Sequence, residues 1–459
     1  MEWLPTLAEG SGPLYLRIAE ALAIDIANGR LLRGQQLPTH RALALALGID
    51  LTTATRAYAE ARRRGLLDAK VGLGTFVSET TIRTADNVRH EIKIDLSMNL
   101  PPHPVEANLD VRITTGLAAI QSASGLTAFL NYQSSGGSDE QRSIAAKWLR
   151  TRVPVASSER LIIYPGTQAI IFNALLSLTS PGDVVVTEML TYPGLKAAAA
   201  TLSLKLVGVA MDEEGVLPDA LDQACKQFKP KVVYLVPTLH NPTSAVLGSE
   251  RRQLIADVIR RNGTFLIEDD VYGLLEPAAS PIANLLPERT YLAVSLSKCI
   301  APALRVSFLL APDAAAEQAM RSLLQASTQM TPPLMVALAI HWLGSGVGDQ
   351  IVMAVRNEAI GRQRLAARIL QGLSFAARPS GHHLWLSLPS WWSRSNFVLH
   401  VLRRGLAVVA SDAFEVARDT APQAVRLSLG AARNRADLVE ALQLVARTLK
   451  SRAATRHVV

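Results

Sequence analysis

Cysteine is scarce in this sequence of 459 residues: only Cys225 and Cys299 occur, far apart in the chain. Two such residues argue against a disulfide framework and fit a reducing cytoplasm. Neither stands in a metal-ligand motif, so we expect no metal site.

Long hydrophobic runs are also missing. The most apolar stretch, residues 161–178, is interrupted by proline, glycine, glutamine and asparagine, which favours a buried strand and helix over a membrane span. Residues 1–12 lack the basic start and apolar run of a secretory signal. We therefore expect a cytoplasmic protein without a membrane partner.

The composition that remains is that of a globular protein with a large core, with 49% hydrophobic and 19% charged residues. A chain of 459 residues is too long for one ordinary core, so we expect two or three domains. The formal net charge is +8, and eight basic against three acidic residues between Arg30 and Val77 supply +5 of it. This balance permits an acidic partner, although charge alone fits a mildly basic enzyme equally well.

The N-terminal residues carry the pattern of three short helices and a hairpin. Apolar positions spaced on one face predict a helix over Pro13–Asn28, and Thr39 is placed to cap a second one. A turn at Gly48 leads to a third helix over Thr52–Gly65, and Lys70–Val77 reads as a β-hairpin. These elements predict a winged helix-turn-helix.

The third helix begins with short polar side chains and an arginine, which suit phosphates and base edges in a major groove. The preceding helix is expected to contact a phosphate, and glycines in the hairpin allow close approach to the DNA backbone. The candidate DNA-binding residues are Arg41, Thr52, Thr53, Thr55, Arg56, Gly74 and Thr75. Taken singly, each residue is weak evidence for DNA binding. A threonine-rich helix start is more often only a cap, and Arg62–Arg64 fit a solvated helix end.

Together these residues resemble the GntR family of winged helix-turn-helix regulators, which implies that residues 1–78 bind double-stranded DNA at an operator. The polar stretch that follows predicts a linker at residues 79–94. Many members have an arginine just after the turn, where this chain has Leu51, which puts one common base contact in doubt. The motifs that carry the resemblance are Pro13-Leu14-Tyr15, Leu37-Pro38-Thr39, Leu47-Gly48, Gly65-Leu66 and Gly74-Thr75-Phe76-Val77.

From residue 95 to 459 short apolar strands alternate with helical stretches, which predicts an α/β domain with a mostly parallel sheet. The last hundred or so residues suggest a smaller α+β subdomain. The strands expected in the large sheet are Arg160–Tyr164, Asp183–Thr187, Lys205–Ala210, Lys231–Val236, Thr264–Glu268 and Tyr291–Ser295, and those in the subdomain are Leu384–Leu388 and Ala424–Leu429.

Polar residues follow four of these strands. Lys298 comes directly after one strand, and a lysine at that place is costly unless it has a task such as bonding a carbonyl cofactor. Asp269 ends another and suits a pyridine nitrogen, which it would keep protonated. A glycine turn and helix start at Gly166 and Thr167 suit a phosphate, and Asn241 suits a phenolic oxygen. Ligands bind at the carboxyl ends of strands in open α/β sheets.

At this point residues 95–459 resemble the fold-type I pyridoxal-phosphate-dependent aminotransferases. The resemblance implies pyridoxal 5'-phosphate (PLP) as cofactor, Lys298 as the lysine of the internal aldimine and Asp269 as the partner of the ring nitrogen. It assigns Gly166, Thr167, Gln168, Ser295, Ser297 and Arg305 to the phosphate, Asn241 and Tyr272 to the ring oxygen, Tyr192 to stacking on the ring, Arg426 to the carboxylate of a substrate or effector, and Tyr132 to a pocket shared across a dimer.

The match has departures and alternatives. His240, Ser244 and His382 stand where glutamine, glycine and glycine are usual, which leaves turnover more open than cofactor binding. As alternatives, Tyr192 is a core aromatic and Arg426 a surface ion-pair partner. Asp270 rather than Asp269 would face the cofactor if the Asp-x-x-Tyr spacing did not hold.

The two modules together resemble the MocR group of GntR-type regulators. This implies a homodimeric, PLP-dependent transcriptional regulator that senses an amino acid, an amine or PLP itself through aldimine exchange at Lys298. One alternative is an active PLP-dependent aminotransferase with an accessory DNA-binding domain, which the retained Lys298, Asp269 and Arg426 keep open. Another is a vestigial pocket in a fold that serves only as a dimerisation scaffold.

Overall fold

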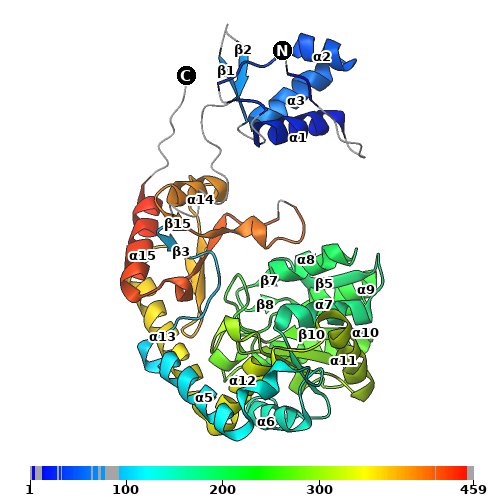
Figure 1. Ribbon diagram of the computed structural model, residues 1–459, viewed down its shortest axis with the longest axis vertical. Helices are drawn as coiled ribbons and strands as arrows, with labels where there is room; N and C mark the ends of the chain where they lie inside the picture. Colours follow the sequence, from blue (N-terminus) through cyan, green and yellow to red (C-terminus); the bar gives the residue numbers. More distant parts are fainter. Residues whose placement is uncertain are drawn as a thin grey trace. The chain divides into compact units, whose positions relative to one another are not determined.

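The computed structural model describes residues 3–5, 13–27, 30–32, 34–63, 66–70, 74–77, 92–418 and 420–451. The chain divides into two compact units, residues 1–91 and residues 92–459 (Figure 1). We call them the head and the body and describe each by itself. The predicted linker lies outside the described residues except for residues 92–94.

The head is the predicted winged helix-turn-helix. Two strands pair antiparallel, with Leu67 opposite Val77 and Lys70 opposite Gly74. Its elements are α1 (Leu14–Ala27), α2 (His40–Leu47), α3 (Leu51–Arg63), β1 (Leu67–Lys70) and β2 (Gly74–Val77).

Local chemistry sets the turn between α2 and α3. The predicted cap is present, because the Thr39 hydroxyl accepts from the Ala42 amide at 3.2 Å. Gly48 ends α2 in the left-handed conformation at φ 64°, which favours glycine. Asp50 then begins α3 by accepting the Thr53 amide at 2.8 Å. The helices close over a small apolar core that includes Leu43 and Tyr58.

A seven-stranded sheet forms the centre of the body, in the order β4-β12-β11-β10-β9-β5-β6. It is mostly parallel as predicted, but β12 pairs antiparallel with both neighbours and has no counterpart among the predicted strands. The strands are β4 (Leu161–Tyr164), β5 (Val184–Glu188), β6 (Lys205–Val209), β9 (Val232–Leu235), β10 (Phe265–Asp269), β11 (Thr290–Ser295) and β12 (Ser307–Leu310), with a small hairpin of β7 (Met211–Asp212) and β8 (Gly215–Val216) beside them.

Helices cover both faces of this sheet. One apolar cluster joins the sheet to α7 (Thr167–Leu178), α8 (Pro193–Thr201) and α11 (Ala314–Thr328). A separate cluster joins it to α9 (Pro218–Phe228) and α10 (Ser249–Asn262). Two faces buried in this way account for the near-continuous apolar strands. Further helices are α5 (Leu109–Ser124), α6 (Asp139–Leu149) and α12 (Pro333–Ser345).

The C-terminal subdomain is an antiparallel four-stranded sheet in the order β13-β14-β17-β16, packed with helices. The segment that enters the body joins it, because β3 (Ile94–Asp95) pairs in parallel with β15 (Leu406–Ala407). The remaining elements are α13 (Val347–Ile369), β13 (Phe375–Ala377), β14 (His383–Ser387), α14 (Arg394–Leu402), β16 (Val409–Ala410), β17 (Ala424–Ser428) and α15 (Arg435–Lys450).

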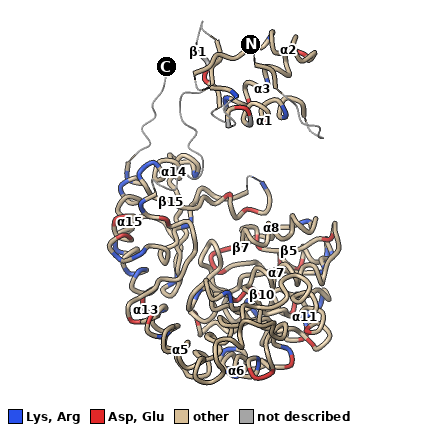
Figure 2. The backbone as a smooth tube through the Cα atoms, in the orientation of Figure 1, with Lys and Arg blue, Asp and Glu red and all other residues tan. Residues whose placement is uncertain are grey.

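Basic and acidic positions are both spread along the body rather than gathered in one stretch (Figure 2). Within the described residues, no single helix has the length and apolar character needed to cross a membrane, and α12 and α13 reach that threshold only as a pair bent by 89°.

Candidate functional site

Two places in the structure collect the predicted functional residues. The first is the exposed side of α2 and α3 in the head, where Arg41, Thr52 and Arg56 are all exposed. Thr52 and Arg56 lie four residues apart, so they share one face of α3. The Arg56 guanidinium stacks over the Tyr15 ring at 4.3 Å, which holds it close to α1.

Two of the predicted DNA-binding threonines already have partners inside the head. The Thr53 hydroxyl donates to Asp50 Oδ2 at 2.6 Å, and the Thr55 hydroxyl donates to the Leu51 carbonyl at 2.8 Å. Their hydroxyl protons are therefore engaged in starting α3. Only their oxygen lone pairs are left for a ligand.

The hairpin approaches the residues before α2 closely. Gly74 has φ 116°, and a Cβ at this position would lie 2.8 Å from Gln36 Nε2. The Thr75 carbonyl accepts the Leu37 amide at 2.9 Å. These contacts tie the wing to the rest of the head. Gly72, the other glycine of the predicted wing, lies outside the described residues.

The second place is a cavity of about 520 Å³ in the body, at the carboxyl ends of the central strands. It gathers residues predicted separately from segments more than 250 positions apart. Of the residues predicted for the phosphate, Gly166 is not in its lining, but a Cβ at Gly166 would clash with the Arg305 guanidinium. The predicted residues that line the cavity are Thr167, Gln168, Tyr192, Asn241, Asp269, Tyr272, Ser295, Ser297, Lys298, Arg305 and Arg426.

One end of the cavity has the donors that an oxyanion needs. Thr167 and Gln168 form the start of α7, where the helix leaves backbone amides unpaired. Arg305 lies beside them and donates to the Pro165 carbonyl at 2.8 Å. The Ser295 hydroxyl, 2.8 Å from the Ser307 hydroxyl, completes this end. The arrangement is suited to a phosphate group.

Asp269, in the lining of the cavity, has an unsatisfied carboxylate oxygen. Its Oδ2 accepts from the Tyr234 hydroxyl at 2.5 Å, while Oδ1 is buried without a hydrogen-bond partner. Burial raises the pKa of Asp269 to about 6, although the Tyr234 bond opposes that shift. A cationic N–H donor at Oδ1 would satisfy both the orphan atom and the buried charge.

Asp270, the alternative to Asp269, has a different partner. Its two carboxylate oxygens accept from Arg152 Nε at 2.9 Å and Nη2 at 3.0 Å. This ion pair is buried, and Asp270 is absent from the cavity lining. The structure thus places Asp269, and not its neighbour, against the cavity.

Lys298 supplies an amine that is easily deprotonated. Its Nζ donates to the Asn99 carbonyl at 2.5 Å. Burial, together with the nearby Arg426 charge, lowers the pKa of Lys298 to about 8. A larger neutral fraction near pH 7 makes the lysine a better nucleophile toward a carbonyl group.

Arg426 is buried in the wall of the cavity and is not a surface ion-pair partner. Its Nη1 donates to Asn241 Oδ1 at 2.7 Å, and its Nη2 donates to the Ser97 carbonyl. Its Nε is buried without a partner. With Lys298 and Arg305 it gives the lining three basic groups against Asp269 alone, an excess that suits a ligand with phosphate and carboxylate groups.

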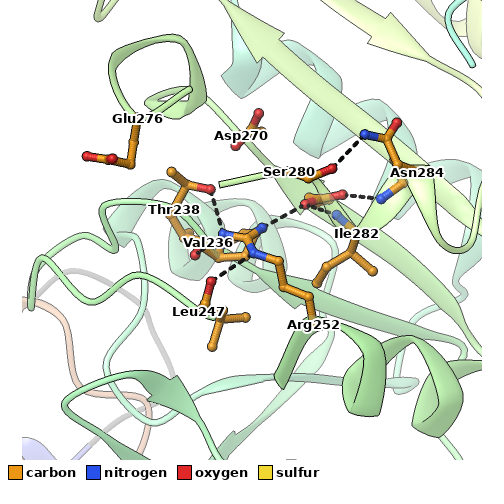
Figure 3. A network of polar contacts seen from close by, with 12 residues as sticks. Val236, Thr238, Leu247, Arg252, Asp270, Glu276, Ser280, Ile282 and Asn284 are labelled. Carbon is orange, nitrogen blue, oxygen red and sulfur yellow. Dashed lines mark hydrogen bonds and ion pairs between the residues drawn. The ribbon is translucent and has the colours of Figure 1, made fainter. Parts of the chain in front are cut away.

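A polar network centred on Arg252 fixes the ends of strands that lead to the cavity residues (Figure 3). Arg252 from α10 donates to the Leu247 carbonyl, the Pro237 carbonyl and the Thr238 hydroxyl at 2.8–3.0 Å. Its guanidinium lies 3.8 Å from Glu268, whose carboxylate also accepts the amides of Ile282 and Ala283 at 2.8 Å. The network therefore anchors both the loop that carries Asn241 and the strand that carries Asp269.

Sequence reasoning missed several residues that line this cavity or bond to the residues that line it. Tyr234 bonds Asp269 from the middle of a buried strand, where its hydroxyl was the only signal. Asn99 and Ser97 come from the segment after β3, and His383 comes from β14. Tyr132, predicted to serve a pocket across a dimer, is 82% exposed and does not line this chain's own cavity.

Comparison with known families matches both units. Residues 14–77 match the family of bacterial regulatory proteins called the gntR family. Residues 91–445 match aminotransferase class I and II. The second match spans more than three quarters of the chain.

Relatives of known sequence align with most of this chain, across both units. YdeF of Bacillus subtilis, an uncharacterised HTH-type transcriptional regulator, is 30% identical over 453 residues, which is 98% of this chain and 97% of YdeF. PtsJ of Salmonella typhimurium, a transcriptional repressor of the vitamin B6 salvage pathway, is 28% identical over 87% of this chain and 90% of its own length.

Solved structures resemble the body in fold. Thermus thermophilus LysN, an α-aminoadipate aminotransferase complexed with N-(5'-phosphopyridoxyl)-L-leucine, has a TM-score of 0.72 at 22% identity, covering 86% of this chain and 98% of LysN. Pyrococcus horikoshii kynurenine aminotransferase has a TM-score of 0.73 at 23% identity, covering 80% of this chain and 92% of the enzyme.

Proposed function

Because the chain belongs to the MocR group, in which a GntR-type helix-turn-helix head is joined to an aminotransferase class I and II body, we propose that it is a transcriptional regulator whose DNA binding responds to an amino compound through PLP. The observation that carries the proposal is the convergence of Lys298, Asp269, Arg305 and Arg426 on one cavity. In the head of the same chain Arg41 and Arg56 are exposed and available to a ligand such as DNA.

The cavity has the groups that PLP requires. Thr167, Gln168, Ser295, Ser297 and Arg305, beside Gly166, would hold the phosphate, and the free oxygen of Asp269 would accept the ring N–H. Tyr192 would stack on the ring, and Asn241 and Tyr272 would bond the ring oxygen. When bound, the cofactor supplies an aldehyde that joins covalently to an amine and a ring that withdraws electrons.

The protein's own residues would then sense the ligand. Lys298 would hold the cofactor through its amine, and its lowered pKa would keep a neutral fraction of that amine available when an effector amine competes for the same group. Arg426 would bind the effector carboxylate by turning away from Asn241 Oδ1 and the Ser97 carbonyl. Effector binding would thereby loosen contacts between the C-terminal subdomain and the central sheet.

Two heads would be needed for a palindromic operator, and a homodimer supplies them. The first elements of the body expose large apolar side chains that suit a partner surface. Val105 is 90% exposed and Leu130 is 82% exposed, and Tyr132 lies beside Leu130 in sequence. A second copy of the chain would cover these residues and bring Tyr132 to its neighbour's cavity.

The test is to purify the protein with its bound ligand, record its visible absorbance and footprint its own upstream DNA with and without a panel of amino donors. The proposal expects absorbance of enzyme-bound PLP, one protected operator and a change in protection with one class of donor. Transamination is assayed with the same panel. Rapid multiple turnover without specific DNA binding would instead establish an aminotransferase with an accessory head, and absence of PLP absorbance would leave only a scaffold.

A further inference from the structure

A chain of hydrogen bonds in the cavity wall links Tyr272 to the C-terminal subdomain. The Asn99 side-chain nitrogen lies 2.7 Å from the Tyr272 hydroxyl and 3.0 Å from His383 Nδ1. His383 Nε2 in turn lies 3.0 Å from the His240 carbonyl. All four residues are buried. The chain therefore runs from β14 through the segment after β3 to the tyrosine beside the cofactor site.

The neutral His383 ring must carry its hydrogen on Nε2. A carbonyl oxygen can only accept, so Nε2 must carry the hydrogen that it donates to His240. Burial lowers the pKa of His383 to about 3, and the Arg426 charge acts in the same direction. The ring is consequently neutral at physiological pH, and Nδ1 has a lone pair and no hydrogen.

This tautomer fixes the orientation of the Asn99 amide. Only its NH₂ group can donate to the bare Nδ1, so the second hydrogen of that group points to the Tyr272 oxygen. Asn99 Oδ1 is left buried without a partner. Amide orientation is decided by the surrounding network, and here the histidine decides it.

We propose that His383 and Asn99 are positioning residues that commit the Tyr272 hydroxyl as a hydrogen-bond donor into the cavity. Because Asn99 already donates to the tyrosine oxygen, the tyrosine's own hydrogen is directed away from Asn99. The acceptor expected there is the ring oxygen of the cofactor, so the inference rests on the proposed function. Donation to that oxygen favours its deprotonated form.

Other groups hold or surround this chain. The Ser244 hydroxyl and the Gln363 amide donate to the His383 carbonyl at 3.2 and 2.9 Å, which anchors β14 at this point. The charged and titratable groups that act on Tyr272 are Arg426, Asp269 and Tyr192. None of these three belongs to the hydrogen-bond chain, so they form a constant background when its members are substituted.

The experiment follows the pH at which the visible absorbance of bound cofactor changes in the purified full chain. In His383→Leu the acceptor at Nδ1 is lost, and Asn99 can turn Oδ1 toward the tyrosine and draw its hydrogen away. One charge-assisted hydrogen bond corresponds to about one to two pKa units. We expect the spectroscopic pKa to rise by about that amount in His383→Leu and to return most of the way in His383→Asn, whose amide oxygen can replace Nδ1.

Asn99→Asp tests the direction of the proton. An aspartate in either protonation state can accept the hydrogen of the Tyr272 hydroxyl, which is then no longer donated to the cofactor, so the spectroscopic pKa rises. The charge of an ionised aspartate also acts directly on the cofactor. The same substitution in a Tyr272→Phe background separates the two effects. The proposal requires that Asn99→Asp raises the spectroscopic pKa less in the Tyr272→Phe background, where only the direct charge effect remains, than in the presence of Tyr272.

The outcomes are distinct. If PLP absorbance is present and His383→Leu titrates as the unsubstituted protein does, or if Asn99→Asp shifts the pKa equally with and without Tyr272, the inference is wrong while the proposed function stands. If no PLP absorbance is found in the unsubstituted protein, the proposed function fails and this inference fails with it.

Discussion

The head and the body present their functional residues in opposite ways. In the head the candidate residues Arg41, Thr52 and Arg56 are exposed on short helices over one small core. In the body Asp269 and Arg426 are buried, and several of their polar atoms are satisfied by residues far away in the chain. Residues that bind DNA need only be exposed on a stable helix. Residues that hold a reactive cofactor must be positioned by buried contacts with the rest of the domain.

This difference also sets how each unit responds to change. A surface residue of the head can be replaced with little effect on folding, but the head has few buried residues to lose. The body has several apolar clusters, so one core substitution removes a smaller share of its stability. A substitution in its cavity, by contrast, is expected to disturb ligand binding directly. Substitutions that change DNA binding without changing cofactor binding, or the reverse, therefore test whether the head and the body act as separate units.

The largest effect is expected from Lys298→Ala. Loss of the amine removes the covalent attachment of PLP, so the visible absorbance of the bound cofactor and any borohydride-reducible adduct disappear, while operator binding is mostly retained. Absorbance spectra and a gel-shift titration measure the two properties. Lys226→Ala, a surface lysine paired with Asp222, is the control and changes neither. A reducible adduct in Lys298→Ala would show that another lysine carries the cofactor.

The next largest effect is expected in the core of the head. Leu43 is fully buried in α2, and Leu43→Ala is expected to cost about 2–5 kcal/mol. That loss is a large part of the stability of so small a unit, so operator binding falls while PLP absorbance persists. Thermal unfolding, followed in parallel by far-UV circular dichroism and by cofactor absorbance, resolves the two units.

The matched control for Leu43 lies two residues further along the same helix. Leu45 is 86% exposed, and Leu45→Ala is expected to leave the thermal transition of the head within its error. If Leu43→Ala lowered the transition of the body as well, the two units would unfold together and the comparison would not hold.

The two units also differ in what could be predicted from their sequences. Elements of the head were predicted to within a few residues, because Thr39, Gly48 and Asp50 determine the turn by local chemistry. In the body most strands were predicted from their apolar runs, but β12 was not. Its antiparallel direction also departs from the strand-helix alternation used for the other strands, and a short apolar run carries no signal of direction.

Individual cavity residues show the same limit. Lys298 and Asp269 were found because each follows a buried strand within a local motif. Asn99 and His383, 284 positions apart, gave no signal, because their contact depends on β3 joining the C-terminal subdomain. Hydrogen bonds between distant segments are set by the fold, so a single sequence does not reveal them.

A third prediction concerns pH and belongs to the body alone. Since the pKa of Lys298 is lowered to about 8, its amine is protonated below that pH and neutral above it. The rate at which PLP-free protein captures the cofactor is expected to rise about tenfold per pH unit up to about pH 8 and then to level off. Stopped-flow absorbance at a series of pH values measures it, with operator affinity as an unaffected reference over the same range.

Two substitutions are expected to move the midpoint of this pH dependence in opposite directions. Arg426→Gln removes a cation that lowers the lysine pKa, so the midpoint moves to higher pH. Asp269→Asn removes an anion that raises it, so the midpoint moves to lower pH. Shifts in the same direction would mean that the titrating group is not Lys298.

The smallest effect is expected at Asp50, where stability and DNA binding are predicted to separate within the head. Asp50→Ala removes the cap of α3 and is expected to cost about 1 kcal/mol, which lowers the melting temperature of a small domain by about 4–8 °C.

Asp50→Asn keeps a capping oxygen and leaves that temperature nearly unchanged. It also removes a negative charge from the start of α3, which we propose lies against DNA phosphates. Operator binding is therefore expected to tighten a few-fold at low salt, with the gain shrinking as salt is added. Differential scanning calorimetry and a salt series of binding titrations measure both effects. Weaker binding in Asp50→Asn would mean that this carboxylate contacts a donor on the DNA, and that the start of α3 reads a base rather than only lying beside the phosphates.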